Sequence, residues 1–207
     1  MKRVLHDIVR ECWRWPLRTY MKHKIKKDNV RILSSNCVGG CLLHDVKRSF
    51  LSPTVNLIID DMDFIKLVYN PEHYLKIEPI FYHISKWGFP VAKIDDIIVH
   101  CVHYNTFGEF KKAWCRRCMR FLEHQDKEIL VMATDSQLKT EEAIQAFHDL
   151  SYRKVCFTAK NNIPYKEFVY VPGYEKSGTT GDINRYCDCK ETRIFEKYFD
   201  CISFING

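Results

Sequence analysis

Short apolar runs alternate with helical patterns along most of this chain. Several of the runs are uniformly apolar, which is typical of strands covered on both faces of a sheet. In three intervening segments, apolar residues recur at the spacing of one helix face: Asp61–Lys76, Phe107–Leu122 and a segment that starts at Thr140. The predicted strands are Val30–Ser35, Val55–Ile59, Ile97–His103, Ile129–Thr134, Val155–Thr158 and Phe168–Val171.

The order of these elements predicts the fold class. Strand, helix, strand order repeated along one chain is typical of α/β proteins. The chain has 207 residues, of which 46% are hydrophobic and 28% charged, and this suits one compact domain with a sizeable core. We therefore predict an α/β layered fold with a largely parallel or mixed central sheet flanked by helices.

An amphipathic helix is predicted ahead of the first strand. Its apolar residues, which include Trp15, recur at helical spacing, and Pro16 is expected to end or kink it. Residues 1–27 hold nine of the 32 Lys and Arg residues of the chain but only two of its 26 Asp and Glu residues. Residues 28–207 are therefore nearly neutral. We predict a basic amphipathic N-terminal arm, residues 1–27, and a single α/β domain, residues 28–207.

Two roles for this arm are left open by its sequence. A cationic helix bearing Trp15 suits the interface of an anionic membrane, and it equally suits packing on the domain or on a second subunit. The nearly neutral domain argues against a nucleic-acid partner. No apolar run is long enough to span a bilayer, and the N-terminus lacks a signal-peptide pattern. We expect a cytoplasmic protein, with peripheral attachment to the inner face of the membrane as the alternative, and leave the oligomeric state open.

The ten cysteines do not predict a disulfide scaffold or a metal site. They are scattered through apolar segments, so most are expected to be reduced and buried. Cys115 and Cys118 fall within a helical pattern, and the spacing of Cys187 and Cys189 is poor for zinc. The carboxylates after the second predicted strand are expected to cap a helix. The sequence identifies no cofactor.

Three chemically reactive side chains follow three of the predicted strands. Cys37 follows the first, His103 the third and Asp135 the fourth. Because the carboxyl ends of parallel strands meet at one edge of a sheet, these residues are expected to lie near one another. Together they would supply a nucleophile, a base and an orienting carboxylate.

The stretch Ser34–Gly40, directly after the first predicted strand, is the strongest candidate for a binding turn. Gly39 and Gly40 would let a ligand approach the backbone closely, and Asn36 would anchor a polar group. Tyr104, next to His103, is expected to contact the substrate as well.

Several of these segments resemble a bacterial family catalogued as domain of unknown function 1919, often labelled exopolysaccharide biosynthesis protein. The family tends to read Ser-Asn-Asn-Cys-Trp-Gly-Gly where this chain has Ser34–Gly40, so Ser35 and Val38 depart from its pattern. The other points of resemblance are Ser52–Val55, Ile98–Tyr104, Trp114 with Arg116 and Arg117, Phe157–Lys160, Gly181 and Asp182, Tyr198–Asp200, and Asn206 with Gly207.

This resemblance implies a role in capsule or exopolysaccharide assembly. The leading hypothesis is an enzyme that transfers a sugar or substituent to a lipid-linked glycan, with a glycan or sugar nucleotide as substrate. In it, Gly39 and Gly40 hold a phosphate, Asn36 holds a sugar hydroxyl and His103 is the general base. The alternatives are an acyl transferase or hydrolase that uses the predicted cysteine triad, and a glycan-binding or assembly factor without catalysis.

Overall fold

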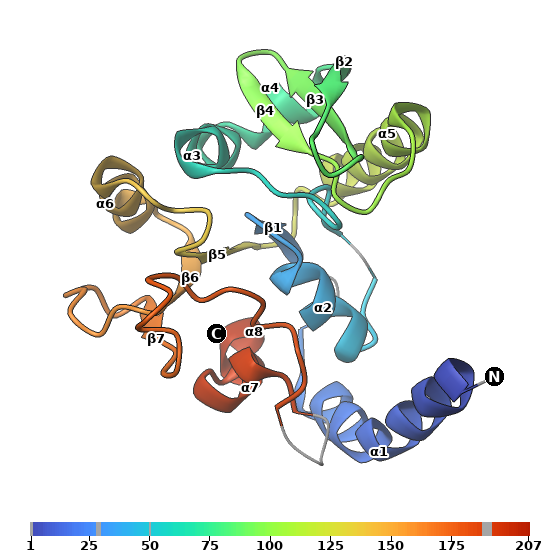
Figure 1. Cartoon of the computed structure of the whole chain (residues 1–207), viewed down its shortest axis with the longest axis vertical. Coiled ribbons are helices and arrows are strands. Elements are labelled where there is room, and N and C mark those ends of the chain that lie inside the picture. The colour runs from blue at the N-terminus through green and yellow to red at the C-terminus, as the bar shows by residue number, and fades with distance from the viewer. Residues whose placement is uncertain (1, 28–29, 50, 188–191) are drawn as a thin grey trace.

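Two separate sheets make up the β structure of the chain (Figure 1). The computed structural model describes residues 2–27, 30–49, 51–187 and 192–207, with the side chains of residues 2–11 and 13 outside the description. A parallel sheet has the order β1-β5-β6-β7, with β1 Arg31–Ser34, β5 Ile129–Thr134, β6 Arg153–Thr158 and β7 Phe168–Tyr170. An antiparallel sheet has the order β2-β3-β4, with β2 Ile80–Ile84, β3 Pro90–Ile94 and β4 Ile97–His100.

Helices cover both faces of the parallel sheet. One face packs with the end of α1 Lys2–Lys24, α2 Val38–Asp45, α7 Ile194–Tyr198 and α8 Cys201–Asn206. The other packs with α3 Asp61–Tyr69, α4 Pro71–Lys76, α5 Phe107–Glu123 and α6 Glu141–Asp149, and with the antiparallel sheet. The predicted α/β layered fold is therefore confirmed.

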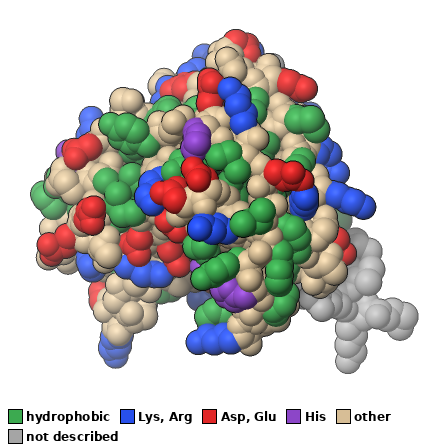
Figure 2. Space-filling model, turned by 90° about the horizontal axis from the view of Figure 1, so that it is seen from above, with side chains coloured by type: hydrophobic (Ala, Val, Ile, Leu, Met, Phe, Trp, Pro, Cys, Tyr) green, Lys and Arg blue, Asp and Glu red, His purple; other side chains and the backbone are tan. Residues whose placement is uncertain are grey.

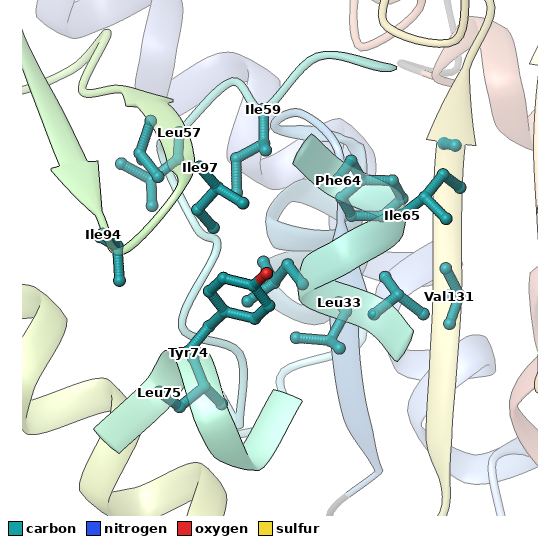
Figure 3. Packing of buried hydrophobic residues seen from close by; sticks show 14 of the residues in the cluster. Leu33, Leu57, Ile59, Phe64, Ile65, Tyr74, Leu75, Ile94, Ile97 and Val131 are labelled. Atoms are coloured by element: carbon teal, nitrogen blue, oxygen red, sulfur yellow. The ribbon is translucent and has the colours of Figure 1, made fainter. Parts of the chain in front are cut away.

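Successive residues of the parallel strands enter the two different cores. Ile32 belongs to one and Leu33 to the other, and Leu130 and Val131 divide in the same way. This explains why the buried residues of these strands follow one another without an alternating polar position. In the core shown in Figure 3, Leu33 and Val131 share a cluster with Ile94 of β3, which joins the two sheets.

Two predicted strands differ from the structure. The segment Val55–Ile59 is no strand: Asn56 has a backbone φ of 66°, which interrupts the extended run, and Ile58 makes only an isolated bridge to His100. The strand predicted at Ile97–His103 ends at His100 and pairs in antiparallel fashion with β3. The strand was expected to end at the edge of the parallel sheet. This expectation was wrong, because β4 belongs to the antiparallel sheet.

Other boundaries follow local chemistry that the apolar pattern did not reveal. The predicted helix Asp61–Lys76 is divided into α3 and α4 at Asn70, because Pro71 occupies the first turn of α4 and the Asn70 side chain accepts a hydrogen bond from the His73 amide. Strands β2 and β3 and helices α7 and α8 were not predicted.

The N-terminal arm packs on the domain through its second half. Helix α1 continues through Pro16 and bends along its course (Figure 1). Met21 and Ile25 are buried in the core beside α2, whereas Trp15, on the predicted apolar stripe, is 58% exposed. Among the described residues, no helix is both long enough and apolar enough to cross a membrane.

A buried ionic cluster holds α1 in place. Arg14 donates to Asp45 at 2.6 Å and to Glu196 at 2.5 Å, and Arg18 donates to Asp45 at 3.1 Å. Arg193 also donates to Asp45. Burial alone would raise the pKa of Asp45, but the hydrogen bonds and charges of Arg193 and Arg14 outweigh it and lower that pKa to about 2. Asp45 is therefore ionised and joins α1, α2 and the start of α7.

Candidate functional site

A pocket of about 400 Å³ opens between α2, the segment before α3, the turn after β4, α5 and the start of α7. We call it the α2–α5 pocket. It contains three of the residues predicted for the site, two from the Ser34–Gly40 stretch and one from the turn after β4. Its lining residues are Cys37, Gly40, Cys41, His44, Val55, Asn56, His103, Arg117 and Arg193.

One face of α2 forms a wall of this pocket. Cys37 precedes the helix, and Cys41 and His44 follow one and two turns later, so all three lie on the same face. The Asn36 side-chain oxygen accepts from the Val38 amide, in the first turn of this helix, at 3.0 Å.

Asn36 holds the start of α2 to the edge of the parallel sheet. Its amide nitrogen donates to Thr134 at 3.0 Å and to Gln137 at 2.7 Å. Asn36 is outside the lining of the α2–α5 pocket, so the structure gives it a structural task in place of the predicted contact with a sugar.

The two glycines permit close packing and do not form an open turn. Both lie inside α2. A Cβ atom on Gly39 would lie 2.8 Å from Ile32 Cγ2, and one on Gly40 would lie 3.2 Å from Val55 Cγ1. The Gly39 amide already donates to Ser34 Oγ, so that amide is not available to hold a phosphate. Gly40 does line the pocket, and there it lets Val55 pack closely on α2.

Arg117 forms the opposite wall and is rigidly held. Its Nη1 donates to the Val55 carbonyl oxygen at 2.8 Å and to Tyr104 Oη at 2.6 Å. Burial raises the pKa of Tyr104 against the opposing charge of Arg117, so the phenol stays neutral. Tyr104 was predicted to contact substrate; in the structure it positions the guanidinium that faces the pocket. The neighbouring His103 is exposed at the pocket.

The described lining of the pocket carries basic groups and no carboxylate. Arg117 and Arg193 contribute guanidinium groups, and His44 and His103 contribute imidazoles. Arg193 donates to Asp45 and to the Asn184 carbonyl oxygen, which fixes its position beside α2. Guanidinium groups of this kind recognise phosphate and carboxylate. The arrangement therefore suits an anionic ligand.

The thiol of Cys37 is not activated in this structure. Burial raises its pKa to about 11, and the neighbouring Cys41 and the charge of Asp182 act in the same direction, while the Asn56 backbone N–H opposes them. Since the thiolate is the reactive form, Cys37 is a weak nucleophile at neutral pH.

Asp135 lies outside the pocket that holds Cys37 and His103. Its carboxylate is buried and accepts from the Ala159 amide at 2.7 Å and from the Thr180 amide and hydroxyl at 2.8 Å each. It anchors the loop before Gly181. The structure therefore brings together two members of the predicted triad and not the third, because the Asp135 carboxylate is held by the backbone at Ala159 and Thr180.

Sequence reasoning missed most of the basic wall of the pocket. Cys41 and His44 continue the helical spacing from Cys37, and this signal was available in the sequence. Arg117 was noted only as part of the family resemblance. Arg193 has no local signal, because α7 and α2 meet only through tertiary packing.

Among the described residues, no group of three or more His, Cys, Asp or Glu side chains is placed to hold a metal ion. Cys115 is half-buried and Cys118 is buried, both within α5. The described part of the chain places Cys187 at the surface, and Cys189 lies outside the described residues.

Comparison with known proteins shows the family. A protein of Haemophilus influenzae with the description "Uncharacterized protein" is 30% identical to this chain over 203 residues, which cover 98% of this chain and 96% of that protein. The profile of a family described as "Domain of unknown function (DUF1919)" matches residues 8–206. The chain therefore belongs to the DUF1919 family.

Proposed function

We propose that the α2–α5 pocket binds the phosphate of a sugar nucleotide or of a lipid-linked glycan, and that the protein transfers a sugar or substituent to a glycan. The observation that supports this most is the guanidinium of Arg117, with the exposed His44 and His103, around a pocket whose described lining has no carboxylate. Arg193 also lines the pocket, but its charge is offset by Asp45. A volume of about 400 Å³ accommodates a phosphorylated sugar more readily than a polymer.

Two of these basic side chains, Arg117 and His103, have distinct roles in this proposal. Arg117, fixed by Tyr104 and the Val55 carbonyl, would bind phosphate oxygens. Its anchoring limits the entropy lost when a ligand binds. His103 is exposed, so its imidazole would reach an acceptor hydroxyl and remove the proton as general base.

The assignment to capsule or exopolysaccharide assembly rests on the family resemblance noted in the sequence. A cytoplasmic enzyme acting on a lipid-linked acceptor at the inner face of a membrane is consistent with that process. The geometry of the pocket supports the class of ligand, an anion, more directly than it supports this process.

Turnover by the purified protein tests the proposal. Nucleoside-diphosphate sugars would be incubated with a lipid-linked glycan acceptor, and release of the nucleotide would be followed. We expect His103→Ala to lower turnover by about a hundredfold or more while donor binding is retained. His100→Ala, on β4 and outside the pocket, is the matched control.

Two outcomes would redirect the proposal. Turnover by His103→Ala equal to that of the wild type would remove the general-base role. Binding of sugar nucleotides without any turnover would favour the alternative of a glycan-binding or assembly factor.

A further inference from the structure

A second surface with its own chemistry lies on the β2–β3 hairpin, at the end of the molecule opposite α1 (Figure 1). Strand β2 is at the edge of its sheet, and all of its residues are exposed. Viewed from above, this end shows hydrophobic side chains gathered between charged ones (Figure 2). Five large apolar side chains here are each at least half exposed; we call them the hairpin patch, and they are Ile80, Phe81, Tyr82, Ile84 and Trp87.

Exposure of this kind requires a partner or a special environment. Soluble domains rarely leave several neighbouring aromatic and aliphatic side chains in water, and a long apolar edge strand is a hazard for aggregation. Trp87, in the turn of the hairpin, is 72% exposed. The patch is therefore expected to be covered when the protein works.

The charge of the hairpin itself favours an anionic partner. Residues 79–94 contain Lys86 and Lys93 and no Asp or Glu. Three carboxylates flank this segment, and each contacts a basic side chain outside it: Glu78 with Lys111, Asp95 with His73 and Asp96 with Lys66. Lys86 Nζ lies 4.5 Å from the centre of the Trp87 ring, and that ring stacks on Phe89. Trp and Tyr favour the membrane–water interface, and lysines there are attracted to anionic headgroups. The hairpin combines both features.

A second copy of the chain would cover this surface poorly. Pairing between two β2 strands would satisfy the backbone groups of the edge but would leave side chains on both faces of the strand in water. The pairing of β2 with β3 also shifts register between Phe81 and His83, and such irregularities disfavour further strands at an edge. A lipid interface contacts a shallowly inserted hairpin on both faces.

We propose that the hairpin patch inserts into the interface of a membrane that contains anionic lipids, with Lys86 at the headgroups beside Trp87. This site is distinct from the basic arm, and it does not depend on the function proposed for the α2–α5 pocket.

Sedimentation of the full-length protein with vesicles tests this proposal. Vesicles of equimolar phosphatidylcholine and phosphatidylglycerol should pellet the wild type, and salt should weaken the binding. Trp87→Ser and Ile84→Ser should each weaken the binding about tenfold, because the variant loses the free energy gained when that large apolar side chain leaves water. Lys86→Gln should weaken binding to these vesicles and leave binding to pure phosphatidylcholine unchanged.

Matched variants separate this site from other exposed apolar groups. Tyr69→Ser removes an exposed aromatic side chain from α3, away from the hairpin, and should bind as the wild type does. Trp15→Ser tests the arm in the same assay. Substitution is preferred to deletion of residues 1–27, because deletion would remove the buried Arg14 and Arg18.

Two results would overturn the proposal. One is a wild type that does not pellet with the vesicles, or hairpin variants that pellet as well as it does. The other is a wild-type dimer, measured by light scattering, that Trp87→Ser converts to a monomer while neither protein binds vesicles; a second copy would then cover the patch.

Discussion

At the scale of single residues, the protonation of Cys37 separates the two catalytic hypotheses. Because burial raises its pKa to about 11, the thiolate is scarce at neutral pH. We expect alkylation of Cys37 by iodoacetamide to be slow near pH 7 and to accelerate as the pH rises toward 11, measured by mass spectrometry of the modified peptides. Exposed Cys12 is an internal control for the reagent. Fast, selective modification of Cys37 at neutral pH would favour the cysteine-dependent alternative.

The sequence identified part of the site at this scale. Cys37 and His103 were expected near each other, and both line the α2–α5 pocket. Asn36 and Tyr104 do not line the pocket. Asn36 binds the start of α2, and Tyr104 binds Arg117, so each positions a part of the pocket wall. Periodicity and spacing indicate which residues lie at strand ends. They do not show whether a polar side chain there bonds to other residues of the protein or remains available to a ligand.

At the scale of elements, the packing of α2 on β1 depends on Gly39. A Cβ atom there would lie 2.8 Å from Ile32 Cγ2 and 2.9 Å from Ser34 Cβ. Gly39→Ala should therefore lower the free energy of unfolding by about 1–3 kcal/mol, as overpacking does. Chemical denaturation measures the change.

Gly108→Ala is the matched control for that substitution. Gly108 is also helical, in the first turn of α5, and a Cβ atom there meets nothing within 4 Å. Because alanine favours the helix, this change should leave stability unchanged or raise it by up to about 1 kcal/mol. Equal effects of the two substitutions would show that the contact between α2 and β1 is not tight.

Helices with an apolar period and strands covered on both faces were predictable, and the exposed hairpin and the short C-terminal helices were not. The strands β1, β5, β6 and β7 are covered on both faces, and their uninterrupted apolar runs predicted them. The hairpin of β2 and β3 was missed. Strand β2 has a largely apolar run like those of the buried strands, yet all of its residues are exposed, so an apolar run does not show whether a strand is covered. The departure from the expected pattern coincides with the surface that we propose binds membrane.

At the scale of the whole molecule, Asp45 connects the N-terminal helix to the domain. Its pKa of about 2 in the folded protein lies below the ordinary value of 3.8, so its contribution to stability is complete above a pH of about 4 and is lost as the pH falls toward 2. Asp45→Asn leaves buried guanidinium groups without this carboxylate. We expect it to lower the free energy of unfolding at neutral pH by about 3–5 kcal/mol, measured by denaturation across this pH range.

Asp96→Asn is the control for the Asp45 substitution. Asp96 also pairs with a basic side chain, Lys66, but both side chains are exposed. It accepts a hydrogen bond from Tyr74 Oη as well, and asparagine keeps an acceptor oxygen, so the loss of its charge should change stability little. If Asp45→Asn were as mild as the control, the ionic cluster would not hold α1 on the domain.

The central claim, that the α2–α5 pocket binds a phosphate-bearing ligand, is tested most directly by calorimetric titration of nucleoside-diphosphate sugars, and of pyrophosphate as the minimal anion. The wild type is compared with Arg117→Met and with Arg116→Met, an exposed neighbour on α5 outside the pocket. We predict binding by the wild type and by Arg116→Met, and affinity reduced about tenfold or more in Arg117→Met, because a charged hydrogen bond to the ligand is lost. Equal affinities in the two variants, or no binding by the wild type, would contradict the claim.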